Sequence, residues 1–321
     1  MTPAHPTAPA ADAPLRSVLY MPASNPRAMA KARDLPCDAV ALDLEDAVAP
    51  EAKATARAAL VAEARAGGFG HRRLIARING HDTPWGADDL AALAAAPVDV
   101  VLAPKIAGEA DVAALSAAMD AAGYAPHVAL WVMIETPRAV LAIERIAAMA
   151  RTTRLAGFML GLNDLAKDTG MVQAPGRAAF VPVLVQVMLA ARGAGHAGTG
   201  GGTGGGGGAG TGGGRGLILL DGVCNAIDDP ARLEAECVQA RDLGFGGKTL
   251  IHPSQITIAN RVFAPDPAAL AEAQAIVAAF ADPANAGKGA LKVDGKMAEI
   301  LHRDMAAALI ARAAAIAARG A

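Results

Sequence analysis

The segment DAVALDLEDAVAPEAKATAR, residues 38–57, contains the unit from which the fold is built. An apolar run at 39–46 ends in acidic residues, and an Ala-rich stretch of helical period follows it at 51–66. The run is apolar on both of its faces, which is typical of a parallel strand covered by helices. The segment therefore predicts a strand, a short loop and a helix that packs against the strand.

The same alternation of strand and helix recurs between residues 16 and 263. We predict eight strands, at 17–22, 39–46, 73–79, 99–105, 128–135, 156–164, 217–223 and 247–253. We predict helices at 26–33, 51–66, 108–122, 137–150, 176–192, 230–242 and 254–263. Eight strand–helix units in roughly 250 residues are what a TIM barrel requires. The sequence therefore predicts an α/β fold, a (β/α)8 barrel over residues 15–263.

Three segments lie outside this pattern. Residues 1–14 are rich in Pro and Ala and predict a disordered tail. The Gly-rich segment 194–216 matches the spacing G-x-G-x-x-G, but it connects a predicted helix to a strand, whereas a dinucleotide-binding loop opens a helix. We interpret it as a flexible insertion. Residues 264–321 predict a helix, a short extended stretch and a final helix, which form an arm over the barrel mouth or a neighbouring subunit.

Composition excludes several classes of protein. The 321 residues are 53% hydrophobic and 19% charged, with a net charge of −2, so a large core is expected and no basic field for nucleic acid. No apolar run reaches the roughly 18 residues of a membrane span, and the N-terminus lacks the regions of a secretory signal. We therefore expect no membrane partner. Cys37, Cys224 and Cys237 show no C-x-x-C spacing, which indicates reduced thiols and a cytoplasmic protein.

Polar side chains stand where the predicted strands end. In a closed barrel these ends converge on one rim, where the active sites of barrel enzymes are built. The residues at these positions are Asp43, Glu45, Asp46, Arg77, Asn79, Lys105, Glu135, Asp164, Asp221 and His252.

Glu135 and Asp164 follow adjacent strands, so their carboxylates can meet, and two carboxylates with water and substrate oxygens are a usual Mg²⁺ site. A structural role for the pair is an equally open interpretation. Arg77 is suited to bind a carboxylate or to stabilise an enolate oxygen, or it pairs with the acidic cluster of residues 43–46. One member of that cluster would form a hydrogen bond to metal-bound water without being a metal ligand itself. The alternative is that the cluster serves only to hold Arg77 in place.

Two lysines suggest a rival chemistry. A rim lysine with a lowered pKa forms a Schiff base in some aldolases, and Lys105 and Lys248 are the candidates. The paired acids favour a metal over this alternative. His252 is a candidate base, although a histidine before proline at a strand end is more often structural.

Several segments in combination resemble the citrate lyase β-subunit-like CoA-ester lyases, a group of Mg²⁺-dependent TIM-barrel aldolases that includes malyl-CoA and citramalyl-CoA lyases. The segments are RSVLYMPASNPRAMAKA (16–32), DAVALDLEDAVAPEAKATAR (38–57), ARING (76–80), LAPKI (102–106), IETPRAV (134–140), GLNDLAKDTG (161–170), LDGVCNAIDDP (220–230) and GFGGKTLIHPSQI (244–256).

The resemblance implies roles for individual residues. Glu135 and Asp164 would bind Mg²⁺, and Arg77 would contact the substrate carboxylate and the enolate oxygen. The residues implied or proposed to bind the CoA ester are Arg16, Asn25, Arg27, Lys31, Arg77 and Lys105. The outer shell of the metal would draw on Asp43, Glu45 and Asp46.

The C-terminal arm departs from the family pattern. The family carries GxMID there and donates its aspartate as the acid or base, in several members to an adjacent subunit. This chain reads GKMAE, so Glu299 stands in the place of the aspartate, one methylene further out. The resemblance also implies a homotrimer or hexamer.

The expected reaction is Mg²⁺-dependent carbon–carbon cleavage of a 3-hydroxyacyl-CoA, such as malyl-CoA or citramalyl-CoA, to acetyl-CoA and a 2-oxo acid. Four alternatives stay open: thioester hydrolysis at the same site, a citrate lyase β subunit acting on a citryl thioester, an aldolase for free 2-oxo acids, and a barrel that binds a CoA ester without catalysis.

Overall fold

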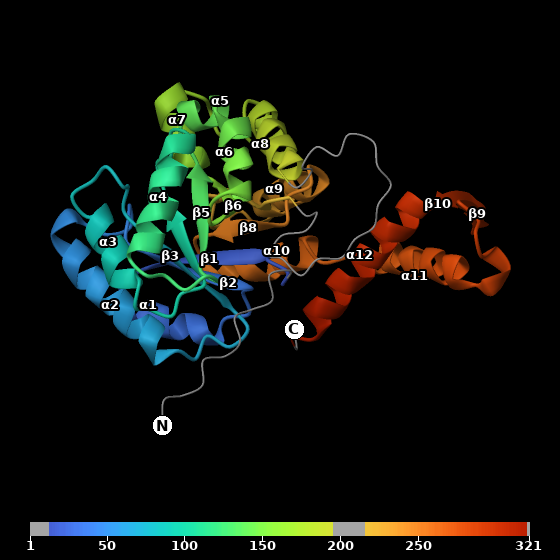
Figure 1. Cartoon of the computed structure of the whole chain (residues 1–321), viewed down its shortest axis with the longest axis horizontal. Coiled ribbons are helices and arrows are strands. Elements are labelled where there is room, and N and C mark those ends of the chain that lie inside the picture. The colour runs from blue at the N-terminus through green and yellow to red at the C-terminus, as the bar shows by residue number, and fades with distance from the viewer. Residues whose placement is uncertain (1–12, 195–215, 320–321) are drawn as a thin grey trace.

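The computed structural model describes residues 13–194 and 216–319. Eight parallel strands close into a barrel in chain order, and β1 pairs with β8 (Figure 1). The strands are β1 Ser17–Pro22, β2 Ala39–Asp43, β3 Arg73–Arg77, β4 Val100–Ala103, β5 Ala129–Ile134, β6 Leu155–Leu160, β7 Ile218–Asp221 and β8 Gly247–Leu250. The predicted barrel is confirmed, and each strand overlaps its predicted range.

Helices surround this barrel (Figure 1). They are α1 Pro26–Lys31, α2 Lys53–Ala66, α3 Gly86–Leu93, α4 Glu109–Ala121, α5 Pro137–Leu141, α6 Ile143–Ala148, α7 Leu162–Thr169, α8 Val181–Gly193, α9 Pro230–Asp242 and α10 Ile256–Val262. The sequence prediction missed α3 and α7. It extended the sixth strand to residue 164, but β6 ends at Leu160, and a helix begins after Gly161. Asp164 therefore lies in the first turn of a helix and not at a strand end.

The core has two layers, because successive strand residues point alternately into the barrel and out towards the helices. Inside the barrel, Val18, Ile75, Leu102, Trp131 and Met159 pack in one cluster. The larger cluster lies between strands and helices and consists mostly of Ala, Val, Leu, Ile and Met. This filled interior leaves the rim formed by the carboxyl ends of the strands as the place for chemistry.

The C-terminal region projects from the barrel (Figure 1). It consists of α11 Pro267–Ala281, the antiparallel hairpin β9 Ala290–Val293 and β10 Lys296–Glu299, and α12 Ile300–Ala317. The hairpin lies at the far end, and α12 returns towards the barrel. There, Arg312 Nη2 donates to the carbonyls of Gly246 and Phe263, each at 3.0 Å, and Arg319 Nη1 lies 3.0 Å from Asp38 Oδ1.

These contacts place the end of α12 at the N-terminal face of the barrel. Gly246 directly precedes β8, and Asp38 directly precedes β2, so both lie opposite the rim. From Arg312 the helix runs back for roughly 18 Å, at 1.5 Å per residue, to its start beside Glu299. The hairpin is thus held away from the rim of its own barrel.

Two predicted segments fall mainly outside the described residues: the tail 1–14, of which 1–12 are not described, and the insertion 194–216, of which 195–215 are not described. Within the described residues, no helix combines the length and apolarity that crossing a membrane requires. The three cysteines are free thiols, and all are buried.

Candidate active site

Arg77 organises one side of the rim. As the last residue of β3, it forms a two-point ion pair with Asp43, with Nε–Oδ1 2.7 Å and Nη2–Oδ2 2.6 Å, and its Nη1 lies 2.6 Å from Glu45 Oε2. Its guanidinium also lies over the ring of Tyr20, 5.0 Å from the ring centroid. Asp46, with an exposed side chain, is further away at 3.9 Å. The guanidinium is therefore fixed in orientation by two buried carboxylates.

Lys105 occupies the middle of the acidic rim. Its backbone adopts the left-handed conformation, with φ of 56°. Its Nζ lies 2.6 Å from Asp164 Oδ1, 3.6 Å from Glu45 Oε1 and 3.8 Å from Glu135 Oε1. Burial lowers its pKa, but the Glu135 carboxylate and the contact with Asp164 outweigh this and raise the pKa above its ordinary value. The ammonium therefore stays charged.

Glu135 is a fully buried carboxylate, with none of its surface exposed. Its Oε1 accepts the backbone N–H of Lys105 at 2.7 Å, whereas its Oε2 has no hydrogen-bond partner among the described residues. Burial raises its pKa from 4.5 to about 8, and Glu45 and Asp164 add to the rise, while Lys105 opposes it. Gly161 provides the room for this side chain, because a Cβ there would lie 2.3 Å from Oε2.

The residues fit a divalent cation. Glu135 and Asp164 approach the same Lys105 ammonium, so the structure already places one positive charge between them. The unpartnered Oε2 of Glu135 is the kind of buried oxygen that a cation satisfies. Among the described residues, no three His, Cys, Asp or Glu side chains are grouped to hold a metal. A cation here would therefore depend on two carboxylates, with water or substrate oxygens as its other ligands.

The raised pKa of Glu135 predicts a pH-dependent stability in the metal-free protein. The folded-state pKa is about 8 and the ordinary value is 4.5, so ionisation of Glu135 disfavours the folded state, and stability is lost as pH rises between these values. Glu135→Gln removes this titration. The measurement is the difference in melting temperature between the variant and the wild type, in EDTA, as a function of pH. We expect this difference to increase in favour of the variant from pH 5 to pH 8 and then to level off. A constant difference across this range would contradict the prediction.

Arg16 does not lie at the predicted CoA site. It precedes β1, at the N-terminal end of the barrel, and its side chain is buried in a two-point ion pair with Asp38, both distances being 2.9 Å. The resemblance implied that Arg16 lies near the CoA phosphates, but the structure places it at the end of β1 opposite the rim, where it is buried in this ion pair. Asn25, Arg27 and Lys31 follow the carboxyl end of β1 and are exposed at the rim side, where Asn25 Oδ1 also caps α1.

Glu299 is exposed at the end of β10 and directly precedes α12. Its backbone N–H donates to His302 Nδ1 at 3.0 Å. Because the hairpin is held away from the rim of the same barrel, the structure does not bring Glu299 together with Glu135 and Asp164 within one chain.

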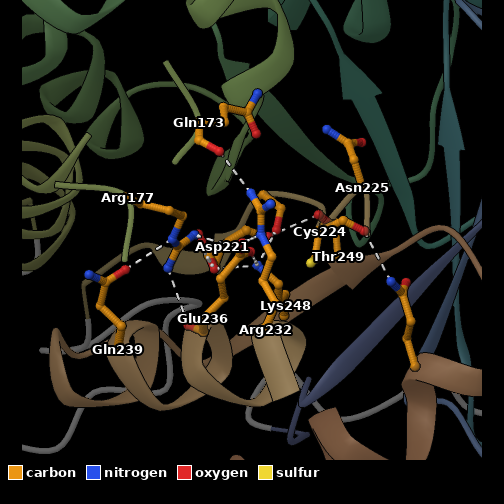
Figure 2. A network of polar contacts seen from close by, with 12 residues as sticks. Gln173, Arg177, Asp221, Cys224, Asn225, Arg232, Glu236, Gln239, Lys248 and Thr249 are labelled. Atoms are coloured by element: carbon orange, nitrogen blue, oxygen red, sulfur yellow. Dashed lines mark hydrogen bonds and ion pairs between the residues drawn. The ribbon is translucent and has the colours of Figure 1, made fainter. Parts of the chain in front are cut away.

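The structure also shows the surroundings of the two candidate Schiff-base lysines and of the candidate base His252. Lys248 is fully buried, and its Nζ lies 2.7 Å from Asp221 Oδ2 and 3.1 Å from Glu236 Oε2 (Figure 2). Neither Lys248, enclosed in this way, nor Lys105, with its raised pKa, has the properties of a Schiff-base lysine. His252 Nδ1 lies 2.8 Å from Ser254 Oγ, in the structural role considered for it.

Sequence reasoning missed Tyr20 and Gly161. The only signal for Tyr20 in the sequence was its rarity, since aromatic residues make up 3% of the chain and this one lies in a predicted strand. Gly161 offered a weak signal, a glycine between a strand and an acidic segment, but its contact with Glu135 arises from strand pairing between β5 and β6.

Comparison with known proteins identifies the family. The sequence pattern described as HpcH/HpaI aldolase/citrate lyase matches residues 16–199, more than half of the chain. The chain belongs to this family. The HpcH/HpaI family pattern is complemented by a second one, described as C-C bond lyase of the TIM-barrel fold, which matches residues 211–317. The resemblance inferred from the sequence segments is confirmed.

Individual proteins similar to this chain carry two kinds of name, thioesterase and lyase. A (3S)-malyl-CoA thioesterase of Cereibacter sphaeroides is 43% identical over 95% of this chain and 96% of its own. An L-malyl-CoA/beta-methylmalyl-CoA lyase of Rhodobacter capsulatus is 31% identical over 93% of this chain and 94% of its own. The structure of the protein CitE from Mycobacterium tuberculosis, solved with magnesium, acetoacetate and coenzyme A, is 29% identical with a TM-score of 0.69, covering 94% of this chain and 99% of that one. The chain is therefore an enzyme of a family that includes CoA-ester lyases and thioesterases.

Proposed function

We propose that this protein is a Mg²⁺-dependent enzyme that hydrolyses the thioester of malyl-CoA or a closely related 3-hydroxyacyl-CoA. The observation that carries the proposal is the rim itself, where Glu135 and Asp164 bracket one cationic position and Arg77 lies on the other side of the same acidic cluster. Mg²⁺, held by Glu135 and Asp164, would polarise substrate oxygens and neutralise negative charge. The binding of magnesium and coenzyme A by the CitE structure supports this assignment.

Hydrolysis and carbon–carbon cleavage place the same demand on these residues. In hydrolysis, water attacks the thioester carbon, the C–S bond breaks, and the proton passes to the sulfur, which leaves malate and CoA. In cleavage, the hydroxyl proton is removed, the C–C electrons pass into the thioester as an enolate, and protonation gives acetyl-CoA with glyoxylate. Negative charge develops on the thioester oxygen in both reactions, and the Arg77 guanidinium is suited to stabilise it.

Two observations favour hydrolysis. The relative named a thioesterase is 43% identical, compared with 31% for the relative named a lyase. The arm carries Glu299 where the lyase pattern of the resemblance has aspartate, and a shift of about an ångström in an acid or base slows a reaction that depends on its position. Carbon–carbon cleavage is the second candidate, because the rim carboxylates and Arg77 of the lyase pattern are all present.

Product analysis separates the two reactions. We expect purified protein with Mg²⁺ to convert (3S)-malyl-CoA to equal amounts of malate and free CoA, followed by mass spectrometry, and we expect EDTA to abolish the conversion. Formation of acetyl-CoA and glyoxylate in equal amounts would establish the lyase instead. Binding of malyl-CoA with no product at all would support a CoA-ester-binding protein.

We further propose that Glu299 acts at the rim of a second copy of the chain, in a trimer or hexamer, since its own barrel is out of reach. Mixing two inactive variants tests this. Glu135→Gln chains supply an intact arm, and Glu299→Gln chains supply an intact rim. After joint refolding or co-expression, we expect about a quarter of wild-type activity, because a quarter of randomly assembled sites receive both intact parts. A mixture as inactive as its components would contradict the exchange of arms.

A further inference from the structure

Three side-chain amides join the loops that follow β6 and β7. Gln173 Nε2 donates to the carbonyl of Leu162 at 3.1 Å and to Asn163 Oδ1 at 2.9 Å. Asn225, from the loop after β7, donates from Nδ2 to the same oxygen at 2.7 Å, and Asn163 Nδ2 lies 3.3 Å from Asn225 Oδ1. Leu162 and Asn163 begin α7, and Asp164 is the next residue. The amides therefore hold the helical turn that carries Asp164.

This turn has little support of its own. Gly161 precedes α7, so no side chain caps its first turn. The Asp164 side chain is partly exposed, and its contact with Lys105 joins two groups that both belong to the reacting region. The position of Asp164 therefore depends on contacts made from outside the helix.

We propose that Gln173 is a positioning residue for Asp164, and that its two hydrogen bonds set the place of this carboxylate relative to Glu135. The inference rests on the proposed role of Asp164 as a ligand of Mg²⁺. A cation held by only two carboxylates is sensitive to their separation, because no third protein ligand compensates for a displaced one.

A buried ion network gives Gln173 a fixed reference. Its backbone carbonyl accepts a hydrogen bond from Arg232 Nη2 at 2.8 Å, and Arg232 Nε lies 3.2 Å from Glu236 Oε1 (Figure 2). Glu236 belongs to the buried cluster with Lys248 and Asp221 described above. The loop that carries Gln173 is thus tied to the interior between β7, β8 and α9.

Arg177 anchors the same loop a second time. Its Nη1 donates to both oxygens of Asp221 at 2.8 Å, and its Nε donates to Gln239 Oε1 at 2.9 Å (Figure 2). Its backbone is left-handed, with φ of 50°, and its side chain is 1% exposed. These two anchors hold the loop through contacts that do not involve α7, so Gln173 meets the turn from a position set by the interior.

Gln173 is the residue to test, because removing a member of the buried ion cluster leaves an unpaired buried charge and destabilises the whole fold. Gln173→Met removes both hydrogen bonds at similar volume and leaves the backbone contact with Arg232 in place. Gln186→Met is the matched control. Gln186 donates one amide hydrogen bond to a backbone carbonyl, that of Val140 at 3.1 Å, and this bond joins α8 to α5 and not to the first turn of α7.

The readout is Mg²⁺ binding by titration calorimetry in the absence of substrate, followed by kcat and KM with malyl-CoA at saturating Mg²⁺. For Gln173→Met we expect Mg²⁺ affinity to fall roughly five- to tenfold and kcat to fall by a similar factor. We expect KM for malyl-CoA to change less than twofold, and Gln186→Met to match the wild type. Asn225→Ala, which removes the second amide contact, should weaken Mg²⁺ binding in the same direction by a smaller factor.

Wild-type Mg²⁺ affinity in both Gln173→Met and Asn225→Ala would overturn the inference while the proposed function stands. A wild-type protein that binds no Mg²⁺ would overturn both together. If Gln173→Met lost melting temperature but bound Mg²⁺ normally, the glutamine would be structural only, and the inference would again be overturned.

Discussion

Replacing Glu135 by glutamine is expected to lower the turnover of malyl-CoA by at least about a thousandfold, equivalent to roughly 4 kcal/mol of transition-state stabilisation. The amide has the same shape as the carboxyl group, and it can still accept the Lys105 N–H at Oε1. It cannot supply the negative charge that a divalent cation requires. The loss should therefore come from chemistry, in a protein that remains folded.

Steady-state kinetics with the product assay described above, together with Mg²⁺ titration calorimetry, measure this effect. Glu144→Gln is the control, since Glu144 is an exposed carboxylate on α6, away from the rim, and this variant should keep wild-type activity. Unchanged turnover in Glu135→Gln would refute the metal assignment. Lost turnover with intact Mg²⁺ binding would move Glu135 from metal binding to another role.

Replacing Arg77 by methionine is expected to reduce both stability and activity. The guanidinium is buried between Asp43 and Glu45, and its removal leaves two carboxylates without their partner. Breaking a buried pair in this way costs about 3–5 kcal/mol of unfolding free energy. Arg77→Lys keeps the charge but loses the two-point geometry, so an intermediate loss of stability is expected.

Urea denaturation measures the stability change, and kinetics on Arg77→Lys at a temperature where it is folded measure the catalytic change. We expect kcat of Arg77→Lys to fall by about 10²-fold, since one oriented donor to a developing oxyanion contributes on that scale. Arg145→Met is the control. It removes an exposed pair with Glu109, where the partners are 65% and 42% exposed, and should cost less than about 1 kcal/mol. Full activity of Arg77→Lys would confine Arg77 to a structural role.

The rim shows why strand ends are informative in a barrel sequence. Arg77 ends β3 and Glu135 directly follows β5, as predicted, and the closed sheet brings them to the same face. Asp164 was selected by the same rule although it lies in a helix, because the helix begins only two residues after β6. Arg16 was not selected by this rule but by the resemblance, and it lies before its strand and therefore at the opposite face.

The sequence by itself determined the order of the eight strands and the identity of the acidic and basic residues at the rim. It could do so because strand and helix periodicities are local, and parallel strands carry their polar ends to one side of a sheet. A glutamate in place of the family aspartate at position 299 was also visible from the resemblance alone.

Only the tertiary structure decided which charges meet. Lys105 lies among Glu45, Glu135 and Asp164, which follow three different strands. Gly161 leaves space for Glu135 because β5 and β6 pair side by side, with Ile134 opposite Leu160. It also decided that Lys248 is enclosed and that the hairpin carrying Glu299 lies away from the rim of its own barrel. Such facts depend on burial and on distances between segments far apart in the chain, and desolvation and Coulomb interactions act through space and not along the sequence.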